Sequence, residues 1–185
     1  MRLFTIGVPQ SCGGALVEVG HTILLWRRAG IEVTVLHFTR CHCGVPRATH
    51  ALHESNPWVH RLRAAGVDFV AVTSGKLADV PGLAGSVVVA MAQQHACHNW
   101  PDMAKLGCKL IWSPAMTCTF PHEGQAFRQV PPSAVHFQSL YQAETIAAEY
   151  YGYGCREFRI IPGAFVPMAL KPRPYNVSGP DPRAP

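Results

Sequence analysis

The sequence contains no apolar run long enough to span a membrane and no long run of basic residues. A transmembrane helix needs about 20 consecutive apolar residues. The first apolar run, Leu3–Ile6, is soon interrupted by Pro9 and the glycines after it, and it is too short for the core of a signal peptide. We therefore expect a cytoplasmic protein without transmembrane segments.

Other absences narrow the class of protein. The seven cysteines are an odd number without the spacing of a disulfide framework, which favours free thiols. Sixteen Lys and Arg residues against 11 Asp and Glu give a net charge of +5. The basic residues are scattered or paired, as in Arg27-Arg28, so no nucleic-acid partner is expected. The charge suits a phosphate-bearing ligand or loose contact with an acidic membrane surface, and an ordinary solvated surface would carry it equally well.

A repeated strand, loop and helix pattern predicts the fold. The length of 185 residues and the 48% of apolar residues allow one domain with a buried core. Residues 3–8 have the pattern of a strand, and residues 15–29 that of a helix ended by Gly30, with Leu16, Val19, Ile23 and Trp26 on one face. Residues 31–36 then form a second strand. A helix between two strands makes a right-handed crossover, so these strands should be parallel.

The same pattern continues to about residue 161. After a loop over residues 40–57, we expect further helices at residues 58–65, 101–106 and 140–151, with Pro101 in a first helical turn. Further strands are expected at residues 67–72, 86–91, 109–112, 134–138 and 158–161. The fold class is α/β: a doubly wound, mainly parallel Rossmann-like sheet with helices on both faces. Residues 1–168 form the domain, and residues 169–185 are a Pro-rich linker or tail.

The first strand leads into Gly13-Gly14 and a helix. Glycines let a ligand approach the backbone closely, and the amides of a helix N-terminus attract a phosphate. The loop is neither a G-x-G-x-x-G sequence nor a P-loop, so dinucleotide or triphosphate binding is poorly supported. A tight turn without a ligand explains the glycines about as well.

The segment after the fourth strand contains His95 and His98. Either imidazole is able to bind a sugar hydroxyl or a developing charge near neutral pH. A helix-capping role and metal binding with Cys97, Cys41 and Cys43 remain alternatives, although C-x-C is not a usual zinc spacing, and we predict no metal site.

The motifs, taken in order, resemble the N-terminal domain of a GT-B-fold retaining glycosyltransferase of the family 4-like group, which includes glycogen synthases and bacterial mannosyltransferases. The resemblance covers nearly the whole chain up to Phe165. Each motif is weak alone, and their order and spacing carry the likeness. The segments that carry it are Gly13-Gly14, Gly30–Val35, His98–Trp100, Phe137–Gln142 and Arg159–Phe165.

The resemblance implies a transfer of sugar from a nucleotide-sugar donor, which is a substrate, so that no cofactor is expected. Gly13 and Gly14 would lie against the donor diphosphate, and His98, or less well His95, would contact the transferred sugar. The chain departs from the family at Ser113–Met116, where many members have a His.

The family's C-terminal donor domain is absent from these 185 residues. We therefore expect half an enzyme, inactive alone, that binds a sugar acceptor and requires a donor domain from a longer or split gene product. The alternative is a standalone, non-catalytic module that binds a phosphorylated sugar or a nucleotide.

Overall fold

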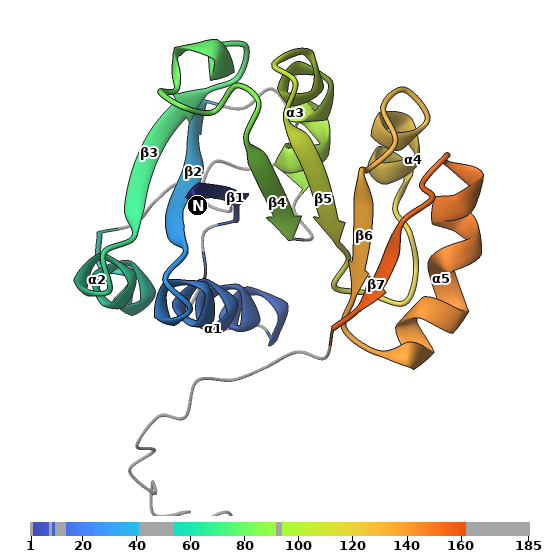
Figure 1. Ribbon diagram of the computed structural model, residues 1–185, viewed down its shortest axis with the longest axis horizontal. Coiled ribbons are helices and arrows are strands. Elements are labelled where there is room, and N and C mark those ends of the chain that lie inside the picture. Colours follow the sequence, from blue (N-terminus) through green and yellow to red (C-terminus); the bar gives the residue numbers. More distant parts are fainter. Residues whose placement is uncertain (1, 8, 10–13, 41–53, 92–93, 162–185) are drawn as a thin grey trace, which may run out of the picture.

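The computed structural model describes residues 2–7, 9, 14–40, 54–91 and 94–161 (Figure 1). Within this part of the chain the strands form one seven-stranded sheet in the order β3-β2-β1-β4-β5-β6-β7, and every neighbouring pair is parallel. The strands are β1 (Arg2–Ile6), β2 (Glu32–Arg40), β3 (Asp68–Thr73), β4 (Val87–Met91), β5 (Lys109–Ser113), β6 (Ala134–Phe137) and β7 (Phe158–Ile160). The predicted parallel α/β sheet is confirmed.

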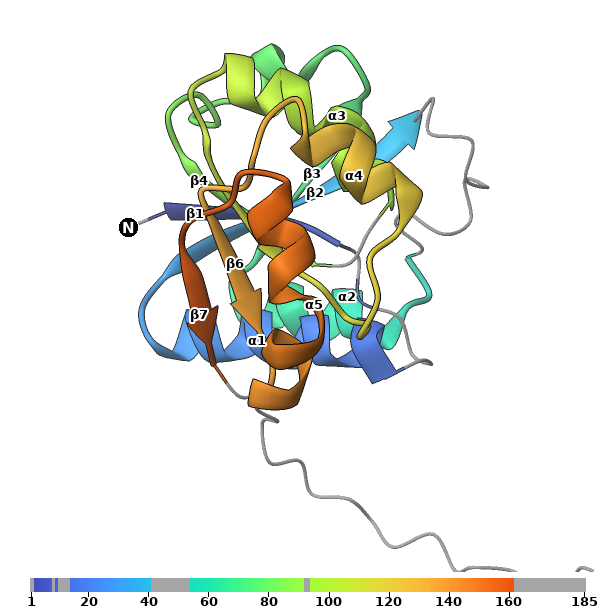
Figure 2. The ribbon, with the colours of Figure 1, turned by 90° about the vertical axis from the view of Figure 1, so that its right-hand side faces the viewer.

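Helices cover both faces of the sheet (Figures 1 and 2). They are α1 (Gly14–Arg28), α2 (Pro57–Ala64), α3 (Gln94–Lys105), α4 (Pro121–Phe127) and α5 (Leu140–Gly152), with a short 3₁₀ turn, η2 (Leu77–Asp79). Side chains of α1 and α2 share one buried cluster, and those of η2, α3, α4 and α5 share the other. The molecule therefore has three layers, with a hydrophobic core on each side of the sheet.

The alternation of side chains along β1 explains how one strand serves both cores. Leu3 belongs to the cluster under α1 and α2, whereas Phe4 and Ile6 belong to the cluster under α3, α4 and α5. Successive side chains of a strand point to opposite faces, so a strand buried on both sides is mostly apolar.

The strand order places β1 in the middle of the sheet. Leu3 of β1 is in register with Val33 of β2 on one side and with Val87 of β4 on the other. The chain leaves β1 through α1 on one face, and it returns from β3 to β4 through η2, whose Leu77 belongs to the opposite core. This change of direction is the topological switch point of a doubly wound sheet, and β1 and β4 lie side by side there.

The predicted helix end at Gly30 is confirmed, and a second helix ends in the same way at Gly66. Gly30 and Gly66, which follow α1 and α2, have φ angles of +79° and +77°, in the left-handed region that favours glycine. On the predicted buried face of α1, Val19 and Ile23 are buried and Trp26 packs partly against the core. The side chain of Leu16 lies outside the described residues.

The predicted helix at residues 101–106 was wrong in its start. Helix α3 begins at Gln94, so Pro101 lies in its interior and not in its first turn. An interior proline costs about 3 kcal/mol, because it removes one backbone hydrogen bond and crowds the preceding turn. Burial of the apolar face of α3 offsets this cost, since Trp100 and Met103 are fully buried.

Two further differences concern the C-terminal half. Helix α4 was not predicted, because its seven residues carry no extended apolar period. Helix α5 ends at Gly152, one residue beyond the predicted end, and is capped by Tyr153; Gly154 follows with φ +99°. The predicted tail at residues 169–185 and most of the predicted loop at residues 40–57 lie outside the described residues. In the part of the chain that is described, none of the helices combines the length and apolar character required to cross a lipid bilayer.

Candidate functional site

The carboxyl ends of β1 and β4 form the edge of the sheet where a ligand site is expected. These two strands are neighbours, and the chain continues from them to helices on opposite faces, α1 after β1 and α3 after β4. Gly7, directly after β1, has a φ of +142°, which side-chain-bearing residues rarely adopt. Diverging loops at a switch point leave a crevice for ligands in folds of this kind.

Two of the helices that start at this edge suit an anion. Helices α1 and α3 are 15 and 12 residues long, and neither has an acidic residue in its first turn. The N-terminal amides of helices attract negatively charged groups. Gly14 is the first residue of α1, whereas Gly13 lies outside the described residues.

Asn56 fixes the geometry beside β1, a role that the sequence analysis missed. Its Nδ2 donates to the carbonyl oxygen of Pro9 over 2.6 Å, and its Oδ1 accepts from the backbone N–H of Trp58 over 3.0 Å. One side chain therefore caps α2 and ties this helix to the segment that follows β1. The Asn56-Pro57 pair is a helix-start signal that sequence reasoning had available.

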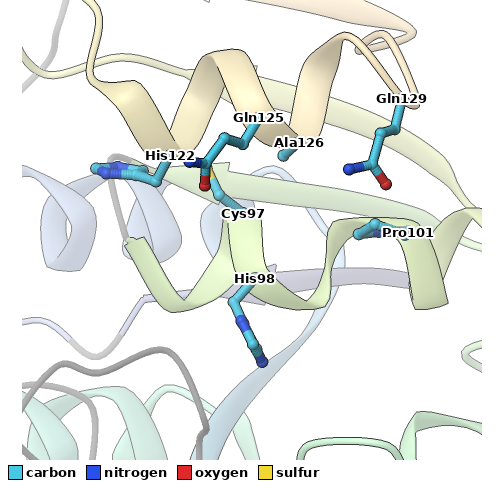
Figure 3. Close-up of a pocket in the computed structure, with 7 residues that line it drawn as sticks. All are labelled: Cys97, His98, Pro101, His122, Gln125, Ala126 and Gln129. Atoms are coloured by element: carbon cyan, nitrogen blue, oxygen red, sulfur yellow. The ribbon is translucent and has the colours of Figure 1, made fainter.

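The two candidate histidines occupy different environments on α3. His95 is only 2% exposed, and its ring packs against Phe38 of β2 with centroids 5.3 Å apart. The carbonyl oxygen of His95 accepts a hydrogen bond from Asn99 Nδ2 over 2.7 Å. His98 is exposed, and Figure 3 shows its imidazole extending away from α4. His98 is thus accessible to a ligand, and His95 is part of the packing.

A pocket of about 230 Å³ lies between α3 and α4 (Figure 3). Its lining combines imidazole, carboxamide and thiol groups with two apolar residues. The lining residues are Cys97, His98, Pro101, His122, Gln125, Ala126 and Gln129. Nothing in the sequence pointed to this pocket, because α4 was not predicted.

A buried polar chain lies behind this pocket. Tyr150 of α5 accepts a hydrogen bond from Trp112 Nε1 over 3.1 Å and donates one to Glu123 of α4 over 2.6 Å. Burial raises the pKa of Glu123 to about 7, against the opposing effect of the Tyr150 hydrogen bond. The carboxyl of Glu123 also disfavours ionisation of the buried Cys97 thiol, whose pKa is raised mainly by burial.

A second polar cluster, also missed, lies at the carboxyl ends of β5 and β6. His136 Nδ1 is 3.2 Å from Ser113 Oγ, and its Nε2 is 2.9 Å from the carbonyl oxygen of Ile161. Because a carbonyl only accepts, Nε2 of His136 donates to Ile161 in this contact. Glu18 of α1 faces this cluster, since its pKa is raised by burial and lowered by His136 and by a hydrogen bond with Gln138. The cluster therefore links α1 with the ends of β5 and β6.

The metal hypothesis finds no site in the part of the chain described by the structure. Among these residues, no group of three or more His, Cys, Asp or Glu side chains is arranged to hold a metal ion. Cys41 and Cys43 lie outside the described residues, so their combination with His95 and Cys97 remains untested.

Comparison with known proteins gives one likeness in fold. No protein-family model and no curated protein sequence matches this chain. Among solved structures, Anabaena Alr3699/HepE in complex with UDP matches it with a TM-score of 0.52 and 13% sequence identity. The match covers 89% of this chain and 44% of the HepE chain, so this chain spans less than half the length of HepE. At this identity the match establishes the Rossmann-like α/β fold.

Proposed function

We propose that this chain is the acceptor-side half of a GT-B-fold glycosyltransferase of the retaining, family 4-like type. The main support is the structural match, in which 89% of this chain aligns with 44% of the HepE chain, a protein solved with UDP. The ordered motifs from Gly13-Gly14 to Arg159–Phe165 support the same class. The substrate is a nucleotide sugar, and a second Rossmann-like domain, in the same or another chain, holds most of the nucleotide.

The donor diphosphate is proposed to lie at the crevice between the ends of β1 and β4. Gly13 and Gly14 leave room for the phosphates, and the α1 N-terminus, with no acid in its first turn, supplies amide donors. The unusual φ of Gly7 and the Asn56 bond to Pro9 hold the backbone beside the crevice. Such pre-organisation lowers the cost of binding.

His98 is proposed to contact the transferred sugar, and His95 is a weaker candidate. An imidazole that acts on a substrate must reach it, and His98 is exposed on the side of α3 away from α4 (Figure 3). His95 is 2% exposed and packs on Phe38. Catalysis through His95 would require a movement of α3 or of the strand below it.

Binding of UDP to the isolated chain tests the proposal. In ¹⁵N-labelled protein, UDP and inorganic pyrophosphate should shift the amide resonances at the start of α1 and α3 and at Gly7. Gly14→Val should weaken this binding about tenfold without a matching loss of Tm, because Cβ and Cγ atoms would occupy the phosphate position. Gly152→Val, where nothing lies within 4 Å of an added Cβ, is the matched control.

The outcomes are separable. Shifts confined to another surface, or none up to the solubility limit of UDP, would contradict the nucleotide crevice. UDP binding followed by transfer only when a donor domain is added supports the half-enzyme. Transfer from a UDP- or GDP-sugar by this chain alone would exclude the half-enzyme. Binding without transfer in the complete gene product would favour the non-catalytic module.

A further inference from the structure

The pocket between α3 and α4 has features of a binding site that the nucleotide crevice does not explain. In Figure 3 the carboxamide of Gln125 lies beside Cys97, and that of Gln129 faces Pro101. The volume of about 230 Å³ is below the range of about 300–1,000 Å³ typical of drug-sized ligands. An occupant of this pocket would therefore be small, about the size of one six-membered ring.

Pro101 removes one backbone hydrogen-bond donor from the helix at the pocket wall. In an α-helix the N–H of residue 101 would donate to the carbonyl oxygen of residue 97, but proline has no N–H. The Cys97 carbonyl therefore lacks its usual partner four residues ahead, and both Cys97 and Pro101 line the pocket. Such an oxygen can accept a hydrogen bond from a ligand hydroxyl.

The lining excludes strongly charged ligands. It contains no Asp, Glu, Lys or Arg, so neither a cation nor an anion finds an opposite charge. Burial lowers the pKa of His122, which keeps its imidazole neutral at physiological pH. Gln125 and Gln129 each offer both donors and an acceptor, as hydroxyl groups do, and Pro101 and Ala126 provide apolar contact for C–H groups.

The walls of the pocket are held in place from behind. Trp100 Nε1 of α3 donates to the carbonyl oxygen of Val130, just after α4, over 2.9 Å. The rings of Trp100 and Phe127 pack edge to face with centroids 5.1 Å apart. The bond from Tyr150 to Glu123 anchors α4 to α5. The pocket is thus formed before a ligand arrives, which reduces the entropic cost of binding.

We propose that the α3–α4 pocket binds a single neutral sugar ring. Its hydroxyls are held by Gln125, Gln129, His122 and the Cys97 carbonyl, and its apolar face rests on Pro101 and Ala126. Gln125, Gln129 and Pro101 take no part in the proposed nucleotide crevice, so sugar binding and UDP binding are separable. The pocket supplies a sugar site on the acceptor-side domain even if the crevice binds no nucleotide.

Titration of ¹⁵N-labelled protein with methyl glycosides of glucose, mannose, galactose and N-acetylglucosamine tests the proposal. At least one should shift the side-chain amide signals of Gln125 and Gln129 saturably, with an affinity in the millimolar range. Gln125→Leu and Gln129→Leu should each raise the dissociation constant about three- to tenfold, the loss of one neutral hydrogen bond. Glu144→Leu, an exposed change on α5, should leave it unaltered. Inorganic phosphate serves as the anionic probe and should not saturate the pocket.

Pro101→Ala separates a binding role from a structural one. Alanine restores the N–H that pairs with the Cys97 carbonyl and relieves the helix, so Tm should rise. The same change engages the Cys97 carbonyl and removes the proline ring from the pocket wall, so glycoside binding should weaken. Unaltered binding in Pro101→Ala and in both glutamine variants, saturation by phosphate, or no shift with any of the four glycosides would overturn the proposal.

Discussion

The hydroxyl of Tyr150 donates a hydrogen bond to the carboxyl of Glu123 over 2.6 Å, although the two residues lie on different helices and 27 positions apart. Both side chains are buried, with Glu123 3% and Tyr150 0% exposed. The carboxyl lies near the Cys97 thiol of α3 and is also affected by Glu149 of α5, whose negative charge adds to the effect of burial. Among the carboxyl groups of the described residues, that of Glu123 has the most strongly shifted pKa.

The first prediction concerns pH. Burial raises the pKa of Glu123 from its usual 4.5 to about 7. Between these values the folded chain holds a proton that the unfolded chain has released, so the free energy of unfolding falls as pH rises and levels off above about 7. In Glu123→Gln this contribution disappears. The stability of the variant relative to wild type should therefore rise between pH 4.5 and 8 by on the order of 3 kcal/mol at most.

Urea unfolding of wild type and Glu123→Gln at several pH values measures this difference. Glu144→Gln, on the exposed side of α5, is the control and should follow the wild-type curve. Parallel curves for wild type and Glu123→Gln would show that Glu123 does not ionise in this range.

The second prediction concerns the tyrosine. Tyr150→Phe leaves the Glu123 carboxyl without its donor and Trp112 Nε1 without its acceptor. Buried groups that lose their partners cost about 1–3 kcal/mol, and thermal unfolding near pH 7 should show that loss. The same change at Tyr153, which is partly buried with its hydroxyl 3.5 Å from Thr119 Oγ1, should cost clearly less. Equal losses at the two positions would mean that the buried chain contributes nothing beyond packing.

The third prediction compares two helical glycines. A Cβ on Gly20 of α1 would lie 2.5 Å from Cε3 of Trp58, in the contact between α1 and α2. Gly20→Ala should therefore destabilise the fold by about 1–3 kcal/mol through overpacking. Gly152→Ala meets nothing within 4 Å and should stabilise it by about 0.5 kcal/mol, because alanine loses less entropy in a helix. Chemical denaturation distinguishes them, and a stabilised Gly20→Ala would refute the close approach of the two helices.

The fourth prediction addresses the histidines in a complete enzyme that contains this chain. His98→Ala should lower the rate of sugar transfer by about two to four orders of magnitude if its imidazole acts on the transition state. Because His98 is exposed, Tm should hardly change. His95→Ala should mainly lower Tm, since it empties a buried position beside Phe38. Full activity in His98→Ala would leave it without a catalytic role.

The sequence predicted the features that depend on neighbours along the chain. Serine is a preferred N-cap residue, and at the start of α5 the Oγ of Ser139 accepts from the Gln142 N–H over 3.1 Å. Gly30 and Gly66 mark two helix ends for a similar reason, since their φ angles suit glycine alone. The parallel sheet followed from the repeated strand, loop and helix pattern.

The site was less predictable. His95 and His98 were considered together from their spacing, yet one is buried and the other is exposed. The helix was expected to start at Pro101, because an interior proline is normally unfavourable, and this start was wrong. In the structure, α3 runs from Gln94 to Lys105 and includes Pro101. Both histidines therefore lie within α3, on sides of the helix that differ in burial.

The sequence by itself determined the order of the strands, most of the helices, the parallel sheet and several helix ends, because side-chain alternation and glycine geometry act over a few residues. The tertiary structure decided the existence of α4, the raised pKa of Glu123 and the pocket between α3 and α4. A seven-residue helix is not stable alone, since forming its first turn costs more than its few hydrogen bonds return. Its stability comes from Trp100, Trp112 and Tyr150, which lie up to 27 residues from Glu123 and whose positions only the folded sheet brings together.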